Sequence, residues 1–216
     1  MPEESKRQSK TAFRVLVVTF ALSIVLLVVF RGGHSDSVQL DFGLADVVGQ
    51  TFGWVILLMA MFVGLKIDGL GWRELQYRRT HLLPSLILGT LVGAVFLICA
   101  DKSPDLRFLL TASGIFAILQ FLIVGLAEET LFRGYVQVRW VAALGWWRGW
   151  LLASATMSLF HVPILLLGEN LSILEVLLET LRLLPLSLLL GYAMRKSGNI
   201  VAPAIIHLWL NLIPAL

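Results

Sequence analysis

The sequence has few charges and a single cysteine. Only 14% of its 216 residues are charged, whereas a soluble domain of this length would be about a quarter charged. The one cysteine, Cys99, lies in an apolar stretch and has no partner for an intrachain disulfide, so we expect it to be a small buried apolar side chain. The composition therefore excludes an ordinary soluble domain and a disulfide-stabilised one.

Several familiar signatures of function are also missing. The chain has no His-Glu-x-x-His zinc-protease motif, no internal repeat of the kind found in transporters and no low-complexity segment. The formal net charge is +3, and the basic residues lie beside apolar stretches, where they meet anionic lipid. We therefore expect no nucleic-acid site, and a proton-coupled transporter is not favoured.

The sequence is instead rich in long apolar stretches. Hydrophobic residues make up 58% of the chain, and its mean hydropathy is +0.86. Since a helix needs about 20 apolar residues to cross a bilayer, we predict an all-α fold, a polytopic bundle of about seven transmembrane helices. Their approximate ranges are 13–30, 44–65, 81–99, 108–130, 150–167, 171–193 and 200–215. The last range is short, and its helix is expected to begin near Pro203.

The basic residues predict the orientation of the bundle. Most of the 17 lysines and arginines fall on one side of the predicted spans, and these are Lys6, Arg7, Lys10, Arg14, Lys66, Arg73, Arg78, Arg79, Arg133, Arg139, Arg148, Arg195 and Lys196. The opposite side carries Arg31, Lys102 and Arg107. Because basic loops stay in the cytoplasm, we predict a cytoplasmic amino terminus and an external carboxyl terminus, in a prokaryotic plasma membrane.

Polar side chains inside the predicted spans are the candidates for function, because a charge at the membrane centre costs about 2.5 kcal/mol or more. Glu128 and Glu129 end the fourth span. Glu129 and Arg133 are one helical turn apart, so we predict an ion pair between them. Glu128 lies about 100° away around the helix and has no cation near it in the sequence. It is therefore a candidate proton carrier near neutral pH.

Two histidines accompany these carboxylates on other predicted helices. His161 lies in the fifth span, and His207 and Asn211 project from one face of the last helix, since they are four residues apart. Pro163 and Pro203 each free a backbone carbonyl near a histidine, which is tolerated at membrane depth where the backbone lines a wet cavity. We predict a polar catalytic cavity between the fourth, fifth and seventh spans, open toward the cytoplasmic side.

Other features have structural interpretations. Glu179 and Arg182 in the sixth span are spaced for an ion pair on one helix. Gly89 and Gly93 have the spacing of close helix packing in membranes. Residues 66–79 mix aromatic and basic side chains, which is typical of a segment at the membrane interface.

The three polar motifs resemble those of the CAAX-protease and bacteriocin-processing family, the glutamic-type intramembrane endopeptidases. Residues 128–134, Glu-Glu-Thr-Leu-Phe-Arg-Gly, resemble its Glu-Glu-x-x-x-Arg motif, and residues 191–211 resemble the stretch that ends in its His-x-x-x-Asn motif. His161 matches the histidine of the middle motif, with Met157 where the family usually has phenylalanine. The replacement is apolar and of similar bulk, so we expect the packing to be kept. The resemblance covers about residues 115–214.

The resemblance implies metal-independent hydrolysis of a peptide bond within the membrane. Glu128 with His161 would activate a water molecule, and His207 with Asn211 would stabilise the oxyanion. No cofactor and no metal are implied. The implied partners are a membrane-associated protein or peptide substrate and the membrane lipids.

Two other functions stay open at this point. One is a zinc-dependent membrane protease, in which Glu128, His161 and His207 would be metal ligands. The other is a non-catalytic membrane protein that confers immunity by binding.

The resemblance also suggests three parts of the chain. Residues 1–12 would be a basic cytoplasmic tail, and residues 13–107 would be the amino-terminal transmembrane helices with their interfacial loop. Residues 108–216 would be the protease core, in which the Glu129–Arg133 pair supports the helix that carries Glu128.

Overall fold

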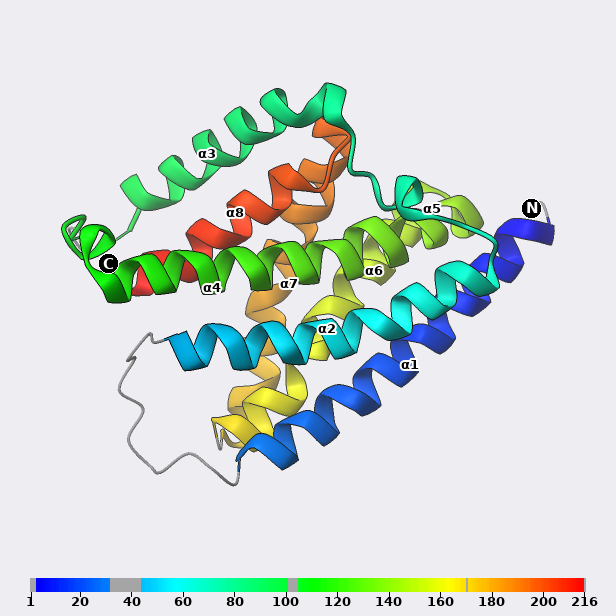
Figure 1. Ribbon diagram of the computed structural model, residues 1–216. Helices are drawn as coiled ribbons and strands as arrows, with labels where there is room; N and C mark the ends of the chain where they lie inside the picture. The colour runs from blue at the N-terminus through cyan, green and yellow to red at the C-terminus, as the bar shows by residue number, and fades with distance from the viewer. Residues whose placement is uncertain (1–2, 32–43, 101–104, 170, 216) are drawn as a thin grey trace.

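The structure is a computed structural model that describes residues 3–31, 44–100, 105–169 and 171–215, and in these ranges it contains helices and no strand. The α-helices are α1 (Glu3–Arg31), α2 (Leu44–Ile67), α3 (Leu82–Ile98), α4 (Ala112–Glu129), α5 (Val138–Leu144), α6 (Trp146–Phe160), α7 (Ile173–Ser197) and α8 (Val201–Leu212). Shorter helical segments are η1 (Trp72–Leu75), η2 (Arg79–His81), η3 (Phe108–Leu110), η6 (Ile213–Ala215) and two π-helical segments, η4 (Thr130–Gln137) and η5 (Ile164–Gly168). The predicted all-α fold is confirmed (Figure 1).

The helices have the lengths and composition of a membrane protein. Five segments are long and apolar enough to cross a bilayer, and these are Glu3–Val28, Val47–Ile67, Trp72–Ile98, Ala112–Leu144 and Trp146–Leu167. The last two predicted spans fall on α7, which has 25 residues, and on α8, which is apolar but has only 12. All seven predicted spans thus correspond to helices, and the chain is an integral membrane protein with a polytopic helical bundle.

The fourth span is longer than predicted. The chain does not leave the helix at residue 130 but continues through the π-helical η4 into α5, which ends at Leu144. Arg133 and Arg139, which we had counted on the cytoplasmic side beyond the end of the fourth span, therefore lie within the helix and are buried. Each has an acidic partner, since Glu129 contacts Arg133 and the carboxylate of Asp68 lies 3.9 Å from Arg139 Nε.

Helix α8 lies between α3 and α4, and glycines allow the close approach (Figure 1). A Cβ atom on Gly89 or Gly93 of α3 would collide with α8. On α4, a Cβ atom on Gly125 would lie 3.0 Å from the carbonyl oxygen of Ala204 and 3.5 Å from Cβ of His207. The predicted packing role of the α3 glycines is confirmed, and α8 is held on both sides.

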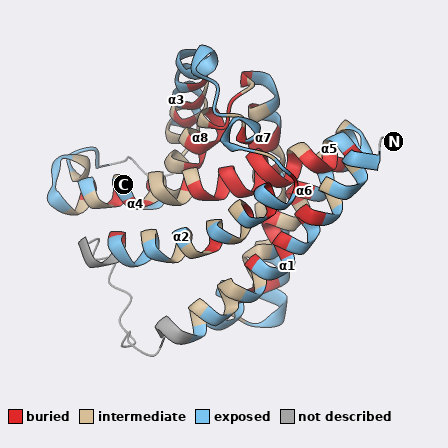
Figure 2. Ribbon diagram, turned by 45° about the vertical axis from the view of Figure 1, so that its right-hand side comes forward, coloured by how far each residue is buried: buried red, intermediate tan, exposed pale blue. Residues whose placement is uncertain are grey.

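The core contains side chains from both the amino-terminal and the carboxyl-terminal parts of the chain. Ala12 and Val15 of α1 and Met61 of α2 are buried in one cluster with Leu131 and Phe132 of η4. Figure 2 shows burial concentrated where α4 continues toward α5, whereas most of α2 is intermediate or exposed. The division at residues 12 and 107 stays a prediction, because α1 is continuous from Glu3 and packs on the proposed protease core.

One smaller expectation is wrong. The side chain of Cys99, expected to be buried, is exposed just after the end of α3. An apolar neighbourhood in the sequence does not imply burial here, because the outward faces of membrane helices are themselves apolar.

Candidate active site

Glu129 and Arg133 form the predicted ion pair at the junction of α4 and η4. Arg133 Nε lies 3.1 Å from Oε2 of Glu129, and both side chains are almost completely buried. The guanidinium also donates hydrogen bonds to the carbonyl oxygen and Oγ of Ser187 on α7, at 2.9 and 3.0 Å, and it contacts the sulfur of Met157 on α6. The pair therefore ties three helices together at one point.

The role expected for Met157 was packing alone, and its contacts are more specific. Its sulfur contacts the Arg133 guanidinium and accepts from Oγ of Ser187 at 3.4 Å. A thioether is a weak acceptor, whereas the phenylalanine usual in the family has none. Neither Met157 nor Ser187 was identified as part of the site from the sequence, because neither is charged.

His207 on α8 lies between the two glutamates. Its Nδ1 is 3.1 Å from Oε1 of Glu129, and since an ionised carboxylate only accepts, the imidazole donates. Its Nε2 is 3.8 Å from Oε2 of Glu128, which is beyond hydrogen-bonding distance. One buried row thus alternates basic and acidic side chains, in the order Arg133, Glu129, His207 and Glu128. From the sequence we had placed His207 around one cavity with Glu128 and His161 and on one helix face with Asn211, and its hydrogen bond with Glu129 was not predicted.

Glu128 and His161 line a common cavity of about 280 Å³. We had predicted that this cavity lies between the fourth, fifth and seventh spans, and the prediction is wrong in part. The fourth and fifth spans do contribute, but α8 is not among the walls; the other walls are the second half of α1 and the first half of α2, with Thr19, Ser23, Gln50 and Trp54 among their residues. Helix α8, which is the seventh predicted span, packs against α4 outside the cavity and brings His207 to Glu128.

The orientation of the bundle decides where the cavity opens. If the amino terminus is cytoplasmic, as predicted, the cavity-lining halves of α1 and α2 are the halves farther from the cytoplasm. The predicted opening toward the cytoplasmic side therefore stays a prediction.

The hydrogen bond of His161 indicates which of its two ring nitrogens carries a proton. Helix α6 ends at Phe160, and Pro163 precedes the π-helical η5, so the backbone is irregular at the histidine as expected. His161 Nδ1 lies 3.0 Å from the carbonyl oxygen of Met157. Because a carbonyl only accepts, Nδ1 carries a proton, and Nε2 of the neutral ring is left as an acceptor.

Asn211 lies one helical turn after His207 on α8. It is partly buried, and its side chain forms no hydrogen bond with the residues that the structure describes. At the other end of α8, Pro203 has no backbone N–H to donate to the carbonyl oxygen of Asn199. That oxygen instead accepts a hydrogen bond of 2.8 Å from Oγ of Ser197. The structure thus brings Glu128, Glu129 and His207 together, whereas the side chain of Asn211, one turn further along α8, has no hydrogen bond to them.

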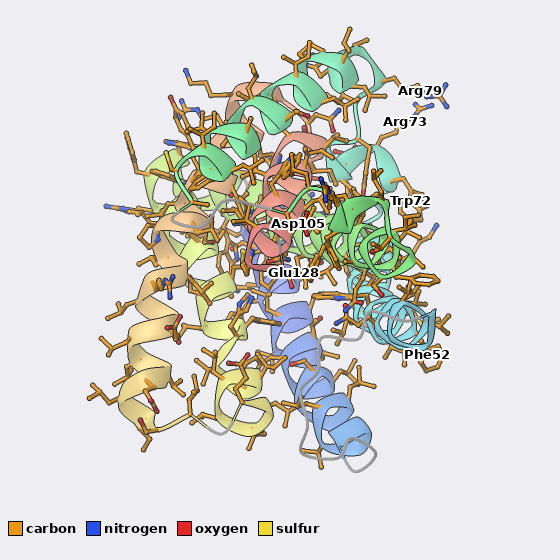
Figure 3. All side chains as sticks on the ribbon, turned by 90° about the vertical axis from the view of Figure 1, so that its left-hand side faces the viewer. Phe52, Trp72, Arg73, Arg79, Asp105 and Glu128 are labelled. Atoms are coloured by element: carbon orange, nitrogen blue, oxygen red, sulfur yellow. The ribbon has the colours of Figure 1, made fainter. Side chains whose placement is uncertain are left out.

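Glu128 lies at the centre of the bundle (Figure 3). Its side chain is buried, and Oε2 has no hydrogen-bond partner among the described residues. Arg73 and Arg79, by contrast, lie at the periphery of the bundle in this view. Over the described part of the chain, no group of three His, Cys, Asp or Glu side chains is arranged to hold a metal ion.

One cavity of this membrane bundle is lined by both a histidine and a carboxylate whose Oε2 has no hydrogen-bond partner among the described residues, and such groups can carry out acid–base chemistry. Comparison with protein families agrees, since residues 110–213 match the family described as type II CAAX prenyl endopeptidase, Rce1-like. This part of the chain is similar to the CAAX-protease family, and the resemblance inferred from the motifs is confirmed. The match supports a membrane endopeptidase, a hydrolase acting on a membrane-associated protein. No curated protein and no solved structure matches the chain.

Proposed function

We propose that the chain is a glutamic-type intramembrane endopeptidase that cleaves a peptide bond of a membrane-associated protein or peptide with an activated water molecule. One observation carries this proposal: Glu128 lines the same cavity as His161, and its Oε2 is buried without a hydrogen-bond partner among the described residues. An unpartnered carboxylate oxygen on a cavity is available to accept a proton from water.

The proposed reaction assigns a separate task to each residue. Glu128 accepts a proton from water while Nε2 of His161 orients the water, and the hydroxide oxygen bonds to the carbonyl carbon of the substrate. The tetrahedral intermediate carries a negative charge on the former carbonyl oxygen, which His207 and the amide of Asn211 stabilise as donors. The carbon–nitrogen bond then breaks, and the proton held by Glu128 passes to the leaving nitrogen.

The ion pair behind the site supports this arrangement. Glu129 bonds both Arg133 and His207, so it fixes the His207 ring with Nε2 directed at Glu128. A protonated His207 would make the row of two carboxylates, one guanidinium and one imidazolium neutral overall. Such neutrality reduces the cost of placing four ionisable groups at membrane depth.

The proposal is tested by comparing the new peptide termini that the wild-type protein and a Glu128→Gln variant generate by cleavage. The purified wild-type protein and the Glu128→Gln variant are each reconstituted in liposomes with a membrane-protein extract of the source cell, and new termini are identified by mass spectrometry. We expect termini that appear with the wild-type protein and are absent with Glu128→Gln. Equal cleavage by both proteins, or none by either, would reject the assignment and favour the non-catalytic binding function.

A further inference from the structure

Helix α1 forms a wall of the cavity that contains Glu128, although it lies outside residues 110–213. One face of α1 packs on the core through Ala12, Val15 and Leu16. The same face continues one turn later with Thr19 and then Ser23, which line the cavity. Figure 3 shows the α1 ribbon, in blue, passing next to Glu128. The packing face of α1 therefore becomes a cavity wall at Thr19.

The hydroxyl of Thr19 is one of three buried serine and threonine hydroxyls without a hydrogen-bond partner among the described residues, together with those of Ser154 and Thr180, and of the three only Thr19 lines the cavity. Hydroxyls on a membrane helix normally bond a backbone carbonyl one turn earlier, as Thr11 does with Arg7, Thr51 with Val47, Thr130 with Leu126 and Thr156 with Leu152. The side chain of Thr19 is completely buried, and its Oγ1 has no hydrogen-bond partner among the described residues. Buried polar groups are rarely left unpaired in proteins, and because Thr19 lines the cavity, a molecule bound there can supply the partner.

Two unpartnered polar atoms thus belong to residues of the same cavity, Oγ1 of Thr19 on α1 and Oε2 of Glu128 on α4. Most of the remaining lining is apolar, with Leu57, Leu131 and Phe132 among it. Its volume of about 280 Å³ is near the lower end of the range for ligand sites, about 300–1,000 Å³. The cavity therefore fits a small apolar group that carries polar atoms at defined places.

We propose that Thr19 is a substrate-binding residue, whose hydroxyl donates a hydrogen bond to a backbone carbonyl of an apolar peptide segment lying extended in the cavity. This inference rests on the proposed endopeptidase function. A peptide must leave the helical conformation to be cleaved, and at membrane depth its freed backbone groups need partners. Thr19 supplies a donor, which complements the carboxylate acceptor at Glu128.

The substrate class follows from this arrangement. The bound segment has apolar side chains, because the walls around Thr19 are apolar, and it is unwound, because a peptide must leave the helical conformation to be cleaved. Selection of the substrate is then shared between α1 and α2 and the apolar residues Leu131 and Phe132, whereas the groups that carry out hydrolysis all lie in residues 110–213.

Replacement of Thr19 by valine tests the inference, because valine has the shape of threonine and lacks the hydroxyl. The substrate is a synthetic peptide spanning a cleavage site found with the wild-type protein, reconstituted in liposomes of phosphatidylethanolamine and phosphatidylglycerol. We expect kcat/KM of Thr19→Val to fall about tenfold, the effect of losing one hydrogen bond, mainly through a higher KM. Thr19→Ser keeps the hydroxyl and is expected to stay within about twofold of wild type.

Thr180→Val is the matched control. Thr180 Oγ1 on α7 is also buried without a hydrogen-bond partner among the described residues, but Thr180 is not part of the cavity lining. We expect wild-type kcat/KM for this variant, and an unchanged melting temperature in detergent for both valine variants. A lower melting temperature of Thr19→Val would indicate a structural role and overturn the inference.

The two proposals fail in different ways. If the wild-type protein cleaves, Glu128→Gln does not, and Thr19→Val cleaves with wild-type kcat/KM, only the role of Thr19 is rejected. If the wild-type protein yields no cleavage, or Glu128→Gln cleaves equally well, the endopeptidase function is rejected and the role of Thr19 with it.

Discussion

His207 Nδ1 lies 3.1 Å from Oε1 of Glu129, so a histidine on the last helix is bonded to the glutamate that also holds Arg133. The two adjacent glutamates consequently have different surroundings. Glu129 has two buried partners, whereas Glu128 lines the cavity and its Oε2 has no hydrogen-bond partner among the described residues. This difference explains why the chain places two carboxylates side by side at membrane depth.

The first prediction separates the two glutamates by stability and activity. Glu129→Gln removes the counter-charge of a completely buried arginine, so we expect a loss of about 3–5 kcal/mol in unfolding free energy and a clearly lower melting temperature in detergent. Glu128→Gln breaks no hydrogen bond within the described residues, and its melting temperature should stay near wild type. Its turnover should fall by about 10²-fold or more. Similar melting temperatures for the two variants would contradict the assigned roles.

The second prediction concerns the glycine that positions His207. In Gly125→Ala the new methyl group would lie 3.0 Å from the carbonyl oxygen of Ala204, so α8 must move by a few tenths of an ångström and carry His207 with it. We expect about a tenfold loss of turnover, since small displacements of catalytic groups are costly. Gly49→Ala on α2, where no atom lies within 4 Å of the new methyl group, is the control. An equal loss in both variants would argue against a role of the α4–α8 contact.

The third prediction concerns metal. Cleavage by the purified protein should be unchanged in the presence of a chelator, and metal analysis should find no stoichiometric zinc, because the proposed reaction uses a carboxylate and imidazoles as acid–base groups. Loss of activity on chelation, followed by recovery with added zinc, would instead assign Glu128, His161 and His207 as metal ligands.

The fourth prediction concerns orientation. Helix α1 begins at one end of the bundle and α8 ends at the other (Figure 1), which agrees with an odd number of crossings. Reporter domains fused after Lys6 and after Leu216 should therefore lie on opposite sides of the membrane, with the amino-terminal fusion in the cytoplasm. Two cytoplasmic reporters would mean that the short α8 does not complete a crossing.

Local patterns predicted the parts of this structure that depend on neighbouring residues. The apolar stretches gave the helices because spanning a bilayer requires a continuous run of apolar residues. The Glu129–Arg133 pair followed from helical spacing, and the Glu179–Arg182 pair of α7 is likewise confirmed, with a distance of 3.6 Å. The end of the fourth span was wrong because Arg133 signals a loop by its charge, while its partners on other helices allow it to be buried.

The sequence alone thus determined the membrane class, the helices and the family that residues 110–213 resemble, since all of these depend on local order along the chain. Only the tertiary structure decided that His207 lies between Glu128 and Glu129, and that α1 and α2 form cavity walls around Glu128 and His161. The physical reason is that helical periodicity specifies which residues share a face but not which helix that face meets. In this bundle the meeting of helices depends on close contacts at Gly89, Gly93 and Gly125, between segments far apart in the sequence.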